Sequence, residues 1–158
     1  MKSATLGVAI FLSAIAFSTA MPAAEDEPTS KCGVAPSATL DDGKVTIAPG
    51  QVICLRMSSV DGKLALTTAN DDTPRNEVFV IEMSSEGDST MLVAHNGTTN
   101  IIKYRAKFQP PGHKKWYPTS ICPVQAGIMG FEQWPHGITT MLLSDFRVLP
   151  QSAEMSCD

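Results

Sequence analysis

The stretch Ile102-Lys103-Tyr104-Arg105-Ala106-Lys107-Phe108 carries the clearest structural signal in the chain. Apolar or small residues occupy every second position, and each residue between them is a cation. A period of two is typical of a half-buried β-strand, because successive side chains of a strand point to opposite faces. We therefore expect one face against a core (Ile102, Tyr104, Ala106, Phe108) and the other in water (Lys103, Arg105, Lys107).

This assignment of faces leads to two quantitative expectations for folding stability. If the ring of Tyr104 is buried, Tyr104→Ala costs about 3–5 kcal/mol of folding stability. If Lys103 lies at the surface, Lys103→Ala changes stability by no more than about 0.5 kcal/mol.

A hairpin is predicted earlier in the chain. Apolar residues alternate from Ile53 to Met57, and Asp61-Gly62 is a typical two-residue hairpin turn. Pairing around that turn sets Val60 against Lys63 and Met57 against Leu66. Directly opposed residues share a face, so the apolar residues of both strands fall on one side.

Asn96-Gly97 is a second hairpin signal, between strands predicted at 91–95 and 102–108. This pairing would oppose Met91 to Ile102 and Val93 to Asn100, which places the apolar residues of both strands on the core face. A connection between two sheets is the alternative. The sequence from Asn96 to Thr98 also matches the N-glycosylation pattern, but we interpret it as a turn.

The remaining segments complete an all-β pattern. A strand at 77–83 has Phe79, Ile81 and Met83 as its core face, an edge strand at 116–124 contains Pro118 and Pro123, and a last strand runs over 138–149. Residues 127–137 are expected to be a loop-rich connection. About eight short strands separated by turns predict a two-sheet sandwich, which resembles immunoglobulin-like folds in architecture only; a small closed β-barrel is the alternative.

The N-terminal region is expected to lie outside this fold. Residues 1–20 have a positive start, an apolar run and small residues before a cleavage site, as in a secretory signal peptide. Residues 21–40 are acidic and Ala/Pro-rich, which indicates a flexible arm. The β-sandwich domain is assigned to 41–149, and a C-terminal tail to 150–158. We expect a periplasmic or secreted protein with no membrane span after signal cleavage.

The charge of the chain argues against nucleic-acid binding. The whole chain has a net charge of −4, and residues 1–20 hold one Lys and no acidic residue, so the rest carries −5. A chain of this sign has no overall attraction for nucleic acid or anionic lipid.

Four cysteines in an exported chain predict two disulfide bonds. Cys54 and Cys122 follow apolar residues that should face the core, so their own side chains should face outward and meet cysteines outside the strands. This favours Cys32–Cys54 with Cys122–Cys157. The alternative is Cys54–Cys122 with Cys32–Cys157. No paired C-x-x-C spacing supports a zinc site.

No constellation of residues predicts catalysis or a cofactor. The three histidines, at 95, 113 and 136, form no metalloprotease motif, and no serine lies in G-x-S-x-G. The pairs Asp41-Asp42 and Asp71-Asp72 stand among turn residues. We therefore expect a protein that is not an enzyme and needs no metal or cofactor.

The most distinctive candidate surface combines aromatic and basic residues. Pro110-Pro111-Gly112 should make the chain leave the sheet, and aromatic rings beside cations can bind a partner protein or glycan. The predicted binding patch is His113, Lys114, Lys115, Trp116, Tyr117 and Trp134. Alternatively, both Trp side chains simply close the end of the sandwich.

The predicted function is therefore that of an exported, non-catalytic β-sandwich that binds a partner, as an accessory, inhibitor or envelope protein. One alternative is a periplasmic metal-binding protein that uses His and Met. Another is a hydrolase with a dispersed active site.

Overall fold

The computed structural model describes residue 32 and residues 38–60 and 63–157, with the side chains of 59, 60 and 63 left out. These residues form ten strands and one short 3-10 helix. The elements are β1 (Thr39–Asp41), β2 (Lys44–Ile47), β3 (Gln51–Val60), β4 (Lys63–Thr68), η1 (Arg75–Glu77), β5 (Phe79–Glu86), β6 (Ser89–Asn96), β7 (Ile101–Gln109), β8 (Tyr117–Thr119), β9 (Met129–Trp134) and β10 (Thr140–Leu149).

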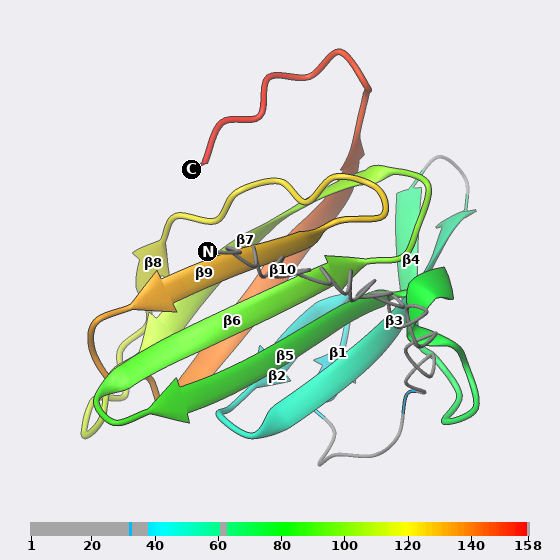
Figure 1. Ribbon diagram of the computed structural model, residues 1–158. Coiled ribbons are helices and arrows are strands. Elements are labelled where there is room, and N and C mark those ends of the chain that lie inside the picture. Colours follow the sequence, from blue (N-terminus) through cyan, green and yellow to red (C-terminus); the bar gives the residue numbers. More distant parts are fainter. Residues whose placement is uncertain (1–31, 33–37, 61–62, 158) are drawn as a thin grey trace, which may run out of the picture.

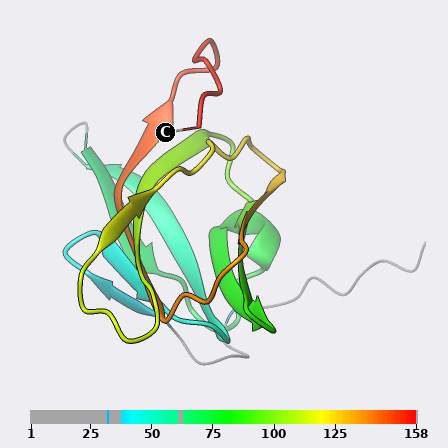
Figure 2. The same ribbon diagram turned by 90° about the vertical axis from the view of Figure 1, so that its left-hand side faces the viewer.

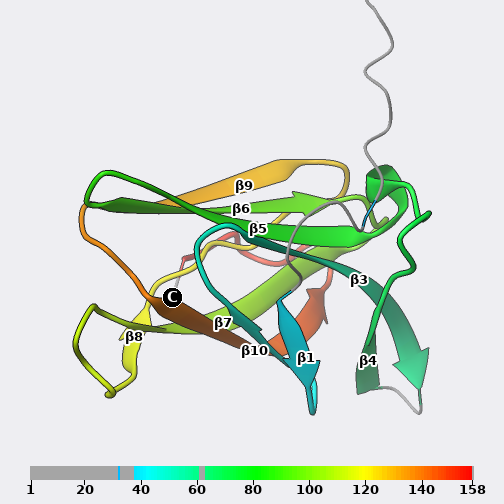
Figure 3. The same cartoon turned by 90° about the horizontal axis from the view of Figure 1, so that it is seen from below.

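The strands form two five-stranded antiparallel sheets packed face to face. Sheet 1 has the order β1-β2-β10-β7-β8, and sheet 2 has the order β4-β3-β5-β6-β9. Figure 3 shows β9, β6 and β5 as one layer and β8, β7 and β10 as the other. The predicted two-sheet sandwich is confirmed, and each sheet keeps two edges among the described strands, so the closed barrel is excluded.

β7 lies inside sheet 1, between β10 and β8 (Figure 1). Its predicted core face is confirmed, because Ile102, Tyr104 and Ala106 are buried. The ring of Tyr104 stacks on that of Phe146 at 5.1 Å between centroids and meets Phe79 edge-on at 5.9 Å. Burial, with a smaller effect of the nearby Glu132 carboxylate, raises the pKa of the Tyr104 phenol.

The opposite face of β7 differs from the prediction at one position. Arg105 and Lys107 are exposed, as expected. Lys103 is instead buried, with 2% of its surface exposed, and its Nζ donates to the carbonyl oxygens of Ile121 (2.5 Å) and Ser156 (3.1 Å). The prediction of a surface lysine is wrong, because later segments of the chain cover this part of the strand.

The β3–β4 hairpin has the predicted register. Met57 pairs with Leu66 and Val60 with Lys63, although the turn at 61–62 lies outside the described residues. The predicted core face of β5 is confirmed as well. Its buried side chains include Phe79, Ile81 and Met83.

The predicted hairpin at Asn96-Gly97 is wrong, and the alternative, a connection between sheets, is what the structure has. β6 pairs with β5 and β9 in sheet 2, whereas β7 pairs with β10 and β8 in sheet 1. The core face of β6 is therefore the one with Leu92 and Ala94, rather than the face with Met91 and Val93. A shift of the strand register by one residue moves every side chain of that strand to the opposite face of the sheet.

Asn96 holds this connection together. Its buried side-chain nitrogen donates to the carbonyl oxygens of Asn100 (2.7 Å) and Val124 (2.9 Å), and its side-chain oxygen accepts from the backbone N–H (3.1 Å) and hydroxyl (2.7 Å) of Thr98. An amide nitrogen used in this way is not accessible for glycosylation in the folded protein.

The predictions for residues 116–124 and 127–137, where the structure has the edge strands β8 and β9, have different outcomes. β8, inside the predicted edge strand at 116–124, is indeed the last strand of sheet 1. The loop expected at 127–137 is wrong, because β9 occupies 129–134 and pairs with β6. Gly130 lies within β9, where an added Cβ would be 3.2 Å from a methyl group of Val124. This glycine marks a close approach between segments rather than a break in the strand.

Both favoured disulfide pairings are confirmed, and no free cysteine remains. Cys54 points away from the main core, as predicted, into a small second cluster that also contains Val52 and Val80. Cys157 ties down the tail that turns back over the chain after β10 (Figure 2). Two disulfides are typical of extracellular or periplasmic proteins.

The predicted signal peptide at 1–20 and most of the predicted arm at 21–40 lie outside the described residues. The first described strand, β1, begins at Thr39. Among the residues that the structure describes, no helix is both long enough and apolar enough to cross a membrane.

Candidate functional site

The loop between β7 and β8, residues 110–116, projects from one end of sheet 1 (Figure 3). Pro110 and Pro111 cannot donate backbone hydrogen bonds to the sheet, and Gly112 adopts a φ of 76° that favours glycine. The backbone N–H of His113 donates to the carbonyl of Pro110 at 3.2 Å. The side-chain amide of Gln109 donates to the carbonyl of Lys114 at 2.8 Å. The loop therefore has a defined shape.

Aromatic rings form the base of this loop. Phe108 on β7 pairs with Tyr117 on β8, and their ring centroids are 6.0 Å apart. His136 also lies against this base, with its ring centroid 5.3 Å from that of Phe108. The Nζ of Lys115 lies 5.5 Å from the centroid of the Tyr117 ring, a distance at which the ring quadrupole attracts a cation.

Five of the six residues of the predicted binding patch lie together on this loop and at its base. Three of them, His113, Lys114 and Lys115, are exposed, while Trp116 and Tyr117 are half-buried. They present a positive tip on a protein of net negative charge.

Trp134 lies elsewhere, in the core at the end of β9. Only 9% of its surface is exposed, and its indole N–H donates to the hydroxyl of Thr119 on β8 at 2.9 Å. The side chain therefore supports the edge strand from inside the sandwich and offers almost no area to a partner. The position of Trp134 therefore agrees with the alternative interpretation, in which its ring closes the end of the sandwich.

The described residues contain no group of three or more His, Cys, Asp or Glu side chains placed to hold a metal ion. The groups around the loop are cations, a histidine and aromatic rings. Such an arrangement can attract and hold an anionic surface.

An exposed apolar surface on sheet 2 was missed by the sequence analysis. Met91, Ile128, Met129 and Phe131 are all exposed, and the last two have 53% and 62% of their surface in solvent. Residues 127–137 contain glycines and a proline, which suggested a loop rather than a strand with two faces. The alternation of apolar Met129 and Phe131 around Gly130 was the available signal.

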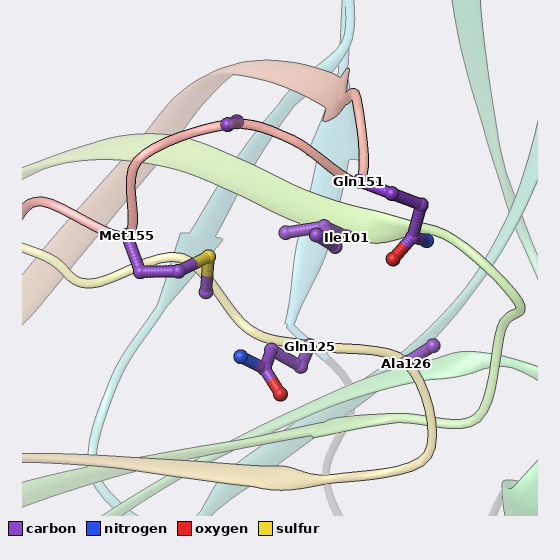
Figure 4. A pocket seen from close by; sticks show the side chains of 6 residues that line it. Ile101, Gln125, Ala126, Gln151 and Met155 are labelled. Atoms are coloured by element: carbon purple, nitrogen blue, oxygen red, sulfur yellow. The ribbon is translucent and has the colours of Figure 1, made fainter.

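Two of the hollows on the described surface lie near the C-terminal tail and near the β3–β4 hairpin. One, of about 200 Å³, lies under the C-terminal tail and is lined by Ile101, Gln125, Ala126, Gln151, Ala153 and Met155 (Figure 4). Its lining residues include no charged or nucleophilic side chain. The other, of about 720 Å³, is a polar groove between the β3–β4 hairpin, η1 and the 97–100 segment.

Comparison with known proteins gave no match to a family model, a curated protein or a solved structure.

Proposed function

We propose that this chain is an exported, non-catalytic β-sandwich protein that binds an anionic partner through its β7–β8 loop. The observation that supports the proposal most directly is the position of Lys114 and Lys115. Both are exposed at the tip of a hydrogen-bonded loop, above a base of aromatic rings.

Charge and apolar area both support binding at this loop. A local positive charge on an acidic protein selects for negatively charged partner surfaces and speeds their approach. The half-buried rings of Trp116 and Tyr117 then offer apolar area with few rotatable bonds, so their ordering on binding costs little. A protein or glycan of the envelope is the expected class of partner.

Pull-down from an envelope extract of the source cells tests this proposal. The bait is the mature protein, compared with the double variant Lys114→Glu, Lys115→Glu. A double variant of Lys44→Glu and Arg147→Glu is the matched control, because it makes the same change of charge at exposed positions on other strands.

The loop variant should lose the captured partner while the control keeps it. Capture by the wild type should also weaken as salt is raised, since charges at a surface are screened over about 8 Å at physiological ionic strength. Equal capture by all three baits would refute the assignment to this loop.

A further inference from the structure

The outer face of sheet 2 is covered in one half and open in the other. Around β3 and β5, the small cluster that includes Cys32, Val52 and Val80 is buried. Around β6 and β9, the surface of Met91, Val93, Met129 and Phe131, called here the β6–β9 face, is open to solvent or only partly buried. Figure 3 shows β9 and β6 side by side in their layer.

The residues of the β6–β9 face form one continuous surface. The strand register pairs Val93 with Phe131, His95 with Met129 and Met91 with Gln133, and directly opposed residues share a face. Six large hydrophobic residues are exposed among those the structure describes, and three of them, Met91, Met129 and Phe131, belong to this face, with Ile128 directly before β9. Exposed apolar side chains gathered in this way mark an interaction surface.

This face contains both a projecting ring and a place to receive one. Phe131 has 62% of its surface exposed. Beside it lies a hollow of about 260 Å³, lined in part by Val52, Met91 and Val93. An interface between two identical copies around a two-fold axis requires this kind of self-complementarity, because each surface element must fit another on the same patch.

The charges of the face also allow two copies to meet. β6 and β9 contain no Lys or Arg. Their one carboxylate, Glu132, opposes the core residue Leu92, so it lies on the other side of β9, where it accepts a hydrogen bond from the backbone N–H of Cys122 at 2.8 Å. Glu82 at the edge of the hollow is paired with Arg75. Glu86, an exposed carboxylate at the end of β5, lines a hollow beside Met91 and Gln133. The centre of the face around Phe131 and Val93 therefore meets a second copy without strong repulsion, although the chain as a whole is acidic.

We infer that the β6–β9 face is the interface of a homodimer, in which Phe131 of each copy inserts into the hollow beside Met91 and Val93 of the other. A specific interface buries about 800 Å² on each partner, so it extends beyond these few apolar side chains. The apolar residues form the centre of the interface, and polar neighbours such as Gln133 and Ser84 form its rim.

Sedimentation equilibrium of the mature, oxidised protein over a wide range of concentrations tests the inference. The wild type should dimerise reversibly. Phe131→Ser should weaken the dimer at least tenfold, as expected for a central apolar residue. Val148→Ser is the matched control, because Val148 is an exposed apolar residue (43%) on β10 of the other sheet. This control should leave the dissociation constant unchanged.

A second variant separates a fitted interface from general stickiness. Val93→Trp adds apolar area to the face but fills the hollow, so it should weaken a dimer built by insertion of Phe131. A stronger dimer for Val93→Trp would overturn the inference, and so would a monomeric wild type or a dimer that Phe131→Ser leaves intact. Near-ultraviolet circular dichroism of each variant verifies that the fold is retained.

Discussion

At the scale of single residues, Lys103 shows how the side-chain nitrogen of a buried lysine is satisfied by backbone oxygens. Removing an ammonium group from water is costly unless polar atoms replace the lost hydration. The carbonyl oxygens of Ile121 and Ser156 provide such atoms. The first comes from the segment before β9 and the second from the C-terminal tail, so one side chain joins two distant parts of the chain to β7.

Lys103→Ala should therefore destabilise the fold by about 2–4 kcal/mol, because it removes buried methylene groups and leaves carbonyl oxygens without a donor. The measurement is the free energy of unfolding from a urea titration. Lys107→Ala, at an exposed position on the same face of the same strand, should change it by no more than about 0.5 kcal/mol. Equal effects of the two substitutions would contradict the buried position of Lys103.

The same side chain shows what sequence alternation can predict. The alternating pattern correctly assigned Ile102, Tyr104 and Ala106 to the core, since the period of a strand fixes which side chains share a face. It carries no information about what covers the opposite face. Lys103 is buried by residues that lie 18 and 53 positions away in sequence, so only the tertiary structure reveals its environment.

At the scale of elements, two similar dipeptides have different roles. Asp42-Gly43 joins β1 to β2 as a tight turn with φ values of 45° and 67°, the conformation that Asn-Gly and Asp-Gly sequences favour in hairpins. Gly97 is not among the residues with positive φ. An added Cβ there would lie 2.5 Å from the carbonyl carbon of Asn76. Position 97 therefore needs glycine for close packing. The Asn-Gly sequence alone does not show whether its glycine serves a hairpin turn or a close contact.

Gly97→Ala should consequently destabilise the protein by about 1–3 kcal/mol, the usual cost of overpacking, because backbone atoms of η1 would have to move. Gly137→Ala is a suitable control, since its added Cβ would come no closer than 3.4 Å to a side-chain atom of Pro111. Thermal unfolding of both variants compares them directly. If Gly97→Ala unfolds at the wild-type temperature, the connection between the sheets does not pack against η1 as described.

The candidate site, like the fold, was predictable only in part from the sequence. Two prolines and a glycine correctly indicated where the chain leaves the sheet, and the nearby residues of the loop were found with them. Trp134 was included because an aromatic residue can serve in a core or at a surface. The hydrogen bond of its indole to Thr119 is a contact between distant residues. The β6–β9 face was missed for a related reason, since glycine inside a strand resembles glycine in a loop.

At the scale of the whole molecule, the two disulfides hold different parts of the fold. Cys32–Cys54 joins residues with a sequence separation of 22 and lies in the small cluster on the outside of sheet 2. Cys122–Cys157 joins residues with a sequence separation of 35 and holds the tail whose Ser156 carbonyl contacts Lys103. Each bond restricts the unfolded chain, and the lost chain entropy predicts a similar stabilisation for both, about 3–4 kcal/mol each. Overall stability alone therefore does not distinguish their roles.

The reactivity of Lys103 does distinguish them. In Cys122→Ser, Cys157→Ser the tail is no longer tied beside β7, so Lys103 loses one of its acceptors and becomes accessible to an amine-acetylating reagent. In Cys32→Ser, Cys54→Ser the tail stays in place, and Lys103 should remain protected while exposed lysines such as Lys107 react in both variants. Peptide mass spectrometry after brief labelling under native conditions measures this. Equal labelling of Lys103 in the two double variants would show that the second disulfide does not control access to this side chain.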